Sequence, residues 1–194
     1  RSSQRPTGSL RSQVMSIFKA YDVRGRVPDD LDVVDALRIG RAVARYFGAG
    51  RLAVGRDARE SSPRLHRALV DGITGVGLGV VDLGCVTTPM LYHAVEVLSL
   101  GGGVMVTASH NPGDYNGFKI CGSHAVPVGE VSGLREIEHF AKESIDLVDT
   151  ASRGQVETED VSASYAAQAL GVASGRAPFR VVLDAANGVA GVAL

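Results

Sequence analysis

Short apolar runs alternate with segments of helical periodicity through most of this chain. Leu52–Val54, Leu78–Leu83 and Gly101–Thr107 have the length and composition of buried strands. The segments after Pro63 and Pro89 carry apolar residues at intervals of three and four, which is typical of one face of a helix. Strands that alternate with helices favour a sheet covered by helices on both faces. We therefore predict an α/β fold, a three-layer α/β/α domain with a mixed, largely parallel sheet.

The same reasoning places the remaining elements of this domain. In chain order they are a strand at Ser16–Ala20, a loop at Tyr21–Arg26, a helix that starts near Pro28–Asp30 and ends at Gly48, a strand at Phe118–Cys121, and a helix at Val131–Lys142. In a parallel sheet the loops at the carboxyl ends of the strands gather at one edge, where ligands bind. Three polar loops are expected to follow strands in this way: Tyr21–Arg26, Gly55–Arg59 and Ser109–Asn116.

The 194 residues suffice for one domain and part of a second. Residues 1–14 are rich in Ser and Arg and lack periodicity, so we predict a tail. The strand–helix alternation gives a first domain at 15–149, and the polar stretch 150–160 is expected to be a linker. Residues 161–194 begin with a helix, followed by a strand at Phe179–Asp184 and a Gly-rich turn. Because a lone strand cannot bury its apolar side chains, we expect the start of a second α/β domain that is cut short.

Charge and cysteine content exclude several classes of function. Lys and Arg total 20 against 21 Asp and Glu, which gives a formal net charge of −1. Neither a nucleic-acid partner nor a membrane partner is expected from this balance, and no apolar run reaches the length of a membrane span. Cys85 and Cys121 lie far apart and form no CxxC motif, so two free thiols in a reducing cytoplasm are predicted. The oligomeric state is left open.

The predicted strand Gly103–Thr107 runs into the polar sequence Ser-His-Asn-Pro at 109–112, and Lys119 follows ten positions after Ser109. An exposed hydroxyl at a strand end can accept a phosphoryl group. Nearby cations and loop N–H groups can then hold the phosphate oxygens. The arrangement predicts a group that carries a phosphoryl unit, and the alternative is a loop serine that caps the next turn.

Several segments, taken in order, resemble the phosphohexomutase superfamily and its phosphomannomutase/phosphoglucomutase branch. They are Phe18–Gly25 (FKAYDVRG), Val54–Asp57 (VGRD), Thr87–Pro89 (TTP), Val106–Pro112 (VTASHNP) and Tyr115–Lys119 (YNGFK). The later sequence Val181–Gly188 (VVLDAANG) is similar to the start of the family's second domain. The resemblance runs from about Met15 to the end of the chain.

The resemblance implies an enzyme that interconverts hexose 1-phosphate and hexose 6-phosphate through a bisphosphorylated sugar, with a hexose bisphosphate as activator. It implies four domains around one cleft, and a Mg²⁺ ion shared by a phosphoserine in the first domain and an Asp-rich loop in the third. No Asp-Gly-Asp-x-Asp-Arg run occurs in this chain, so we expect the 194 residues alone to be inactive. Two alternatives stay open: a phosphoglucosamine mutase, and a non-catalytic phosphosugar-binding module.

The resemblance also assigns roles to single residues. Ser109 is the expected phosphoryl carrier and, through its phosphate, the metal contact of this domain. His110 is expected to contact phosphate or substrate, and Lys119 to act as an acid/base or to stabilise charge; a structural loop histidine and a solvated lysine are the alternatives.

Arg24, Tyr21 and Asn116 are the expected substrate- or phosphate-binding residues. A guanidinium fork at Arg24 suits phosphate oxygens, against the alternative of a surface ion pair. Asn116 precedes a glycine, so capping of a turn competes with a ligand contact. Arg56 and Asp57 are equally compatible with a pair that shapes the cleft wall and with direct contacts to a ligand.

Overall fold

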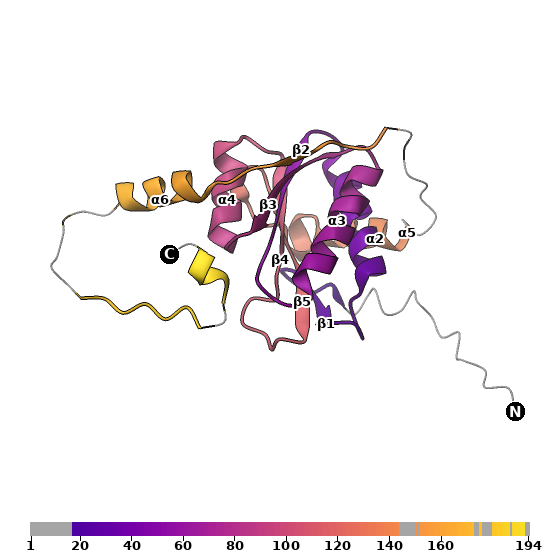
Figure 1. Cartoon of the computed structure of the whole chain (residues 1–194). Helices are drawn as coiled ribbons and strands as arrows, with labels where there is room; N and C mark the ends of the chain where they lie inside the picture. The colour runs from indigo at the N-terminus through magenta and orange to yellow at the C-terminus, as the bar shows by residue number, and fades with distance from the viewer. Residues whose placement is uncertain are drawn as a thin grey trace, which may run out of the picture.

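The computed structural model describes residues 17–143, 150, 152–172, 175, 180–186 and 188–192. Their main elements are β1 (Val23–Arg26), α2 (Val33–Phe47), β2 (Arg51–Arg56), α3 (Ser62–Gly75), β3 (Gly79–Cys85), α4 (Thr88–Val97), β4 (Gly102–Val106), β5 (Tyr115–Gly122), α5 (Leu134–Glu143), β6 (Val156–Thr158) and α6 (Ser162–Gly171). Short 3-10 turns cover Ser123–Ala125, Glu130–Ser132 and Val189–Val192. Figure 1 shows a twisted sheet between helices, so the predicted α/β class is confirmed.

The six strands are ordered β1-β5-β4-β2-β3-β6. Strands β4, β2, β3 and β6 are parallel neighbours, whereas β5 runs antiparallel to both β4 and β1. The carboxyl ends of β2 and β4 therefore lie at the same edge, and the amino end of β5 joins them there. This topology brings the loop after β2 beside the loop that links β4 to β5, as expected for ligand loops of an α/β sheet.

Alternate residues of each central strand point to opposite faces, which gives the domain two hydrophobic cores. Val54, Val104 and Val106 pack toward α2, α3 and α5, while Ala53 and Met105 pack toward α4. Every residue of β4 is buried, because helices cover both of its faces. The strand that leads to Ser109 is thus held firmly on both sides.

Helices α2 and α3 meet backbone to backbone through a pair of glycines. A Cβ atom on Gly40 would lie 2.3 Å from the carbonyl oxygen of Leu69, and one on Gly72 would lie 2.2 Å from that of Leu37. No side chain larger than hydrogen fits at either position without moving a helix. The two glycines therefore set how closely α3 approaches the rest of the domain.

Two boundaries near the start of the domain differ from the prediction. Helix α2 begins at Val33, because the carboxylate of Asp32 accepts hydrogen bonds from two backbone N–H groups, of Val34 and Asp35. The expected strand at Ser16–Ala20 is wrong over its described residues, since Phe18 forms only an isolated bridge to Val23. The strand β1 lies instead inside the predicted loop.

The expected linker at 150–160 contains a strand of the same sheet. Strand β6 pairs in parallel with β3, and all three of its side chains are exposed. An exposed edge strand has no apolar face to alternate with a polar one, so its sequence carries no strand signal. The division of the chain into two domains stays a prediction.

The helix expected at the start of 161–194 is present as α6, and it contacts α4 through His93. His93 Nε2 lies 2.9 Å from Ser164 Oγ, and its ring packs edge-on against Tyr165 with 5.7 Å between ring centroids. Residues 180–184 form no strand, and Val181–Leu183 have exposed side chains; Phe179 lies outside the described residues. Figure 1 shows α6 to the side of the sheet, beyond α4.

Both cysteines are free thiols, with Cys121 buried and Cys85 partly so. Burial raises the pKa of the Cys121 thiol to about 11, which makes it unreactive at neutral pH. Within the ranges that the structure describes, every helix is too short or too polar to cross a membrane.

Candidate active site

The serine loop, defined here as residues 107–115, leaves the buried end of β4 and turns sharply at Ser109. Ser109 has a φ of 56°, in the left-handed region that non-glycine residues seldom adopt. Its backbone N–H donates to Thr107 Oγ1 at 3.0 Å, and its side chain is exposed. Ser109 Oγ lies 3.3 Å from His110 Nδ1. The loop thus presents the hydroxyl outward with an imidazole beside it.

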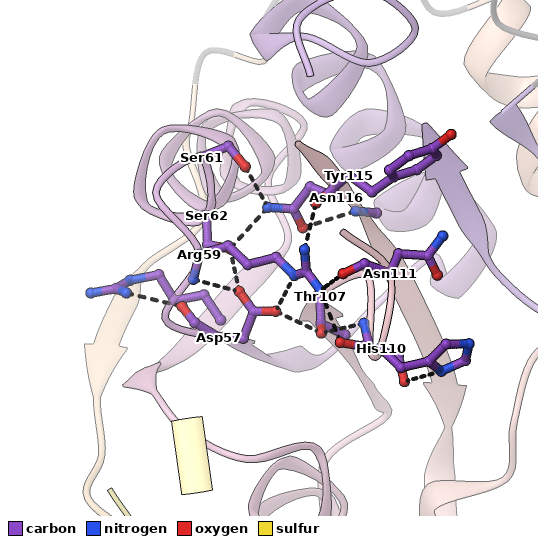
Figure 2. A network of polar contacts seen from close by, with 12 residues as sticks. Asp57, Arg59, Ser61, Ser62, Thr107, His110, Asn111, Tyr115 and Asn116 are labelled. Carbon is purple, nitrogen blue, oxygen red and sulfur yellow. Dashed lines mark hydrogen bonds and ion pairs between the residues drawn. The ribbon is translucent and has the colours of Figure 1, made fainter. Parts of the chain in front are cut away.

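Arg59, in the loop after β2, fills the inside of the serine loop. Its Nη2 donates to the carbonyl oxygens of Ser109 and Asn111 at 2.9 and 2.7 Å. Its Nη1 donates to those of Pro112 and Tyr115 at 2.6 and 3.1 Å. Figure 2 shows the guanidinium surrounded by these backbone groups, with the His110 and Asn111 side chains on the side away from Asp57.

Asp57 connects this guanidinium to the end of β4. Its carboxylate pairs with Arg59 Nε at 3.1 Å and accepts a hydrogen bond from Thr107 Oγ1 at 2.7 Å. It also accepts from the hydroxyl of Ser62, the first residue of α3. Asp57 is buried, and Arg56 donates to its backbone carbonyl rather than to its carboxylate. Of the two readings of Asp57, the geometry favours the structural one.

Asn116 is 0% exposed, which favours the capping of a turn over the expected phosphate contact. Its amide nitrogen donates to Ser61 Oγ and Ser62 Oγ at 2.8 and 2.9 Å, and its Oδ1 accepts from the N–H of Gly117 at 2.8 Å. Every polar atom of the side chain is therefore used within the protein. Asn116 fastens the start of β5 to the start of α3.

A cleft of about 690 Å³ adjoins the outer side of the serine loop. Arg24 on β1 donates from Nη1 to Asn111 Oδ1 at 2.6 Å and forms an ion pair with Asp22. Lys119 on β5 reaches the same carboxylate, with 4.0 Å between Nζ and Asp22 Oδ2. The ring of Tyr21, 83% exposed, stands at the rim.

The charges that line this cleft favour an anion. Lys19, Arg24 and Lys119 face two carboxylates, of which Asp22 is already engaged by Arg24. Arg24 contacts the serine loop at Asn111, so a guanidinium suited to phosphate oxygens lies next to the loop that carries Ser109. Arg24 does form an ion pair, as the surface-pair alternative required, but the pair lies inside the cleft.

The structure therefore brings Arg24, Lys119 and Tyr21 into one cleft, which the serine loop adjoins through Asn111 and Tyr115. Ser109 and His110 lie exposed on that loop, whereas Asn116 is turned inward. Sequence reasoning did not identify Arg59, Asp22 or Asn111. A signal for Arg59 existed, because a second arginine two residues after Asp57 lies in a loop at a strand end. Among the residues that the structure describes, no group of three or more His, Cys, Asp or Glu side chains could hold a metal ion.

Comparisons with known proteins identify one family along most of this chain. The sequence profile described as phosphoglucomutase/phosphomannomutase, alpha/beta/alpha domain I, matches residues 15–146. The phosphomannomutase/phosphoglucomutase of Pseudomonas aeruginosa is 44% identical over 181 residues, which are 91% of this chain and 38% of that protein. A phosphomannomutase of Escherichia coli is 38% identical over 91% of this chain and 40% of its own length.

A crystal structure of a phosphoglucomutase/phosphomannomutase family protein from Burkholderia thailandensis superposes with a TM-score of 0.71. It is 36% identical and covers 82% of this chain and 36% of its own. This chain spans 38% to 40% of the length of the two curated relatives described above. On the profile match and these relatives together, the chain belongs to the phosphoglucomutase/phosphomannomutase family.

Proposed function

We propose that this chain is the phosphoserine-carrying part of a phosphomannomutase/phosphoglucomutase that interconverts hexose 1-phosphate and hexose 6-phosphate. Ser109 carries the phosphoryl group. The enzyme transfers it to a free sugar hydroxyl, forms a hexose bisphosphate, and takes back the phosphoryl group from the other sugar oxygen. The observation that carries this proposal is the exposed Ser109 hydroxyl, presented at the end of a buried strand beside the cation-lined cleft.

Each transfer breaks one P–O bond and forms another. When phosphorylated Ser109 donates, its P–O bond breaks, the sugar oxygen forms a new P–O bond and loses its proton, and Ser109 Oγ regains one. A phosphate at Ser109 adds roughly −1.5 to −2 charges. Arg24 and Lys119 offset this charge, and His110, whose Nδ1 lies 3.3 Å from the hydroxyl, is placed to hydrogen bond to the serine oxygen or its phosphate.

Members of this family generally use Mg²⁺. The described part of this chain offers the metal one contact, an oxygen of the phosphate on Ser109, because its carboxylates form no cluster around the loop. A bound Mg²⁺ ion would supply charge neutralisation for the transferring phosphoryl group. The remaining ligands are expected outside these 194 residues, in line with the absence of an Asp-Gly-Asp-x-Asp-Arg run.

The test is to incubate the full-length protein with glucose 1,6-bisphosphate and map the phosphate by mass spectrometry. We expect one phosphate on Ser109, together with conversion of mannose 1-phosphate and glucose 1-phosphate in the presence of Mg²⁺. Phosphate confined to other residues would overturn the assignment. Conversion of glucosamine 1-phosphate alone would identify a phosphoglucosamine mutase instead. Binding of hexose phosphates without turnover would support the non-catalytic module.

The 194-residue chain, assayed by itself, is expected to show no mutase activity. Positioning of both ends of the sugar phosphate provides most of the catalysis in phosphoryl transfer, and the described site contacts one phosphate position. The assay uses the same sugar phosphates, Mg²⁺ and bisphosphate. Sustained turnover by the isolated chain would require a complete site within these 194 residues.

A further inference from the structure

We propose that Arg59 is a positioning residue for phosphoryl transfer, which holds the backbone of Ser109 in the conformation that presents its hydroxyl. This inference rests on the proposed function, because it assigns a role in the step that Ser109 performs. Arg59 lies behind the serine loop and not in the cleft, so it acts on the reaction through the loop backbone.

Ser109 occupies a backbone conformation that costs free energy. A non-glycine residue at a φ of 56° is strained, and such strain persists only when the surroundings impose it. In the serine loop the surroundings act on both sides of the residue. Thr107 Oγ1 accepts the N–H of Ser109, and Arg59 Nη2 donates to its carbonyl oxygen.

The two contacts on Ser109 converge on one carboxylate. Thr107 Oγ1 donates to Asp57 Oδ2, and Arg59 Nε pairs with the same oxygen. Asp57 thereby holds both partners of the Ser109 backbone: Thr107, which accepts its N–H, and Arg59, which donates to its carbonyl oxygen. The hydroxyl of Ser109 is left free of this network and faces outward.

The geometry requires an arginine. The two terminal nitrogens of the Arg59 guanidinium bind four carbonyl oxygens spread over residues 109–115. Its Nε donates to Asp57. A lysine ammonium has three donors on one atom and cannot span these acceptors. Neighbouring Asp57 also offsets the charge of Arg59, and both side chains are largely buried. The contribution to the reaction is therefore geometric rather than electrostatic.

A positioning role predicts a specific kinetic signature. Loosening the loop misplaces the nucleophilic oxygen without removing a contact to the sugar, so kcat falls while KM changes little. We expect kcat to fall on the order of 10-fold for Arg59→Lys and on the order of 100-fold for Arg59→Ala. Transfer from glucose 1,6-bisphosphate to Ser109 in a single turnover should slow by the same factors.

The experiment uses the full-length protein, with Arg67→Lys as a matched control, since Arg67 is exposed on α3 and away from the loop. Hydrogen exchange of the peptide spanning residues 107–115 is measured first, because it reports on the loop whether or not the protein is a mutase. Exchange should quicken in both Arg59 variants and stay at the wild-type rate in Arg67→Lys. Unchanged exchange in the Arg59 variants would overturn the positioning role.

The second measurement is rescue of Arg59→Ala by guanidinium at concentrations well below the unfolding transition, against sodium chloride at equal ionic strength. Recovery of single-turnover transfer by guanidinium alone supports the proposal, because a variant that is merely unfolded gains nothing. If wild-type Ser109 is never phosphorylated, the proposed function is wrong. The hydrogen-exchange result still decides whether Arg59 holds the serine loop in place. If wild type transfers normally and both Arg59 variants match it, Arg59 has no such role.

Discussion

The serine loop and the region from α6 onward are both surface segments, yet they are fastened in opposite ways. The serine loop is held by the largely buried side chain of Arg59, which binds its backbone carbonyls, including that of the strained Ser109. In α6, no residue of the helix is buried, and its contact with α4 depends on a few side chains around His93. The comparison teaches that a rigid loop needs buried polar partners, while a surface helix can dock through a single cluster. Paired substitutions in the two regions test this contrast.

The largest effect is expected from removing the phosphoryl carrier. Ser109→Ala should reduce turnover at least roughly 1,000-fold, because the relay loses the group that it phosphorylates. Ser164→Ala in α6 is the matched control and should leave turnover unchanged. Steady-state conversion of mannose 1-phosphate by the full-length protein measures both. Equal activity of the two variants would contradict the difference between the regions.

The next effect concerns stability. Asn116→Ala leaves the N–H of Gly117 buried without its acceptor and removes two hydrogen bonds to the start of α3. We expect the free energy of unfolding to fall by about 3 kcal/mol. Gln168→Ala, on exposed α6, should cost under about 1 kcal/mol. Urea unfolding of the 194-residue chain measures both, and similar losses would show that the serine loop is no more tightly coupled than α6.

Replacement of Arg24 by Lys tests the cleft. The guanidinium binds Asn111 and Asp22 at once, which an ammonium cannot reproduce in the same plane. Turnover is expected to fall about 10-fold, with weaker affinity for the bisphosphate. Arg153→Lys, in an exposed pair with Asp71, is the control and should have no effect on either. If Arg24→Lys has wild-type kinetics, the ion pair between Arg24 and Asp22 has a structural role and Arg24 does not bind the phosphate.

The smallest effect is expected at His93. His93→Ala removes the contacts to Ser164, Gln168 and Tyr165. A ten-residue helix is marginal without tertiary contacts, so backbone exchange in α6 should approach that of a free peptide. Global unfolding should change by no more than about 1 kcal/mol, and exchange in the serine loop should not change. Faster exchange in both regions would show that they are coupled.

The sequence predicted the sheet and the serine loop because both depend on local patterns. The apolar run before Thr107 and the turn residues after it are visible within a dozen positions. Arg59 was missed because its four acceptors lie some fifty residues away, on backbone atoms that have no residue-type signal. The choice between capping and ligand contact at Asn116 stayed open, since spacing alone cannot show that Ser61 and Ser62 enclose its side chain. Strands β1 and β6 are short and lie at the sheet edges, where hydrophobic periodicity is weak.

The glycine contact between α2 and α3 affects how natural variation in this gene should be interpreted. Alanine in place of a mid-helix glycine ordinarily raises stability, so a survey of genotypes would score Gly40→Ala as benign. Here the added methyl would displace α3 at the carbonyl of Leu69. Because α3 begins at Ser62, whose hydroxyl joins Asp57 and Asn116, that displacement reaches the serine loop. The phosphoryl transfer proposed for Ser109 is therefore expected to weaken in such a variant, although every residue of the cleft is unaltered.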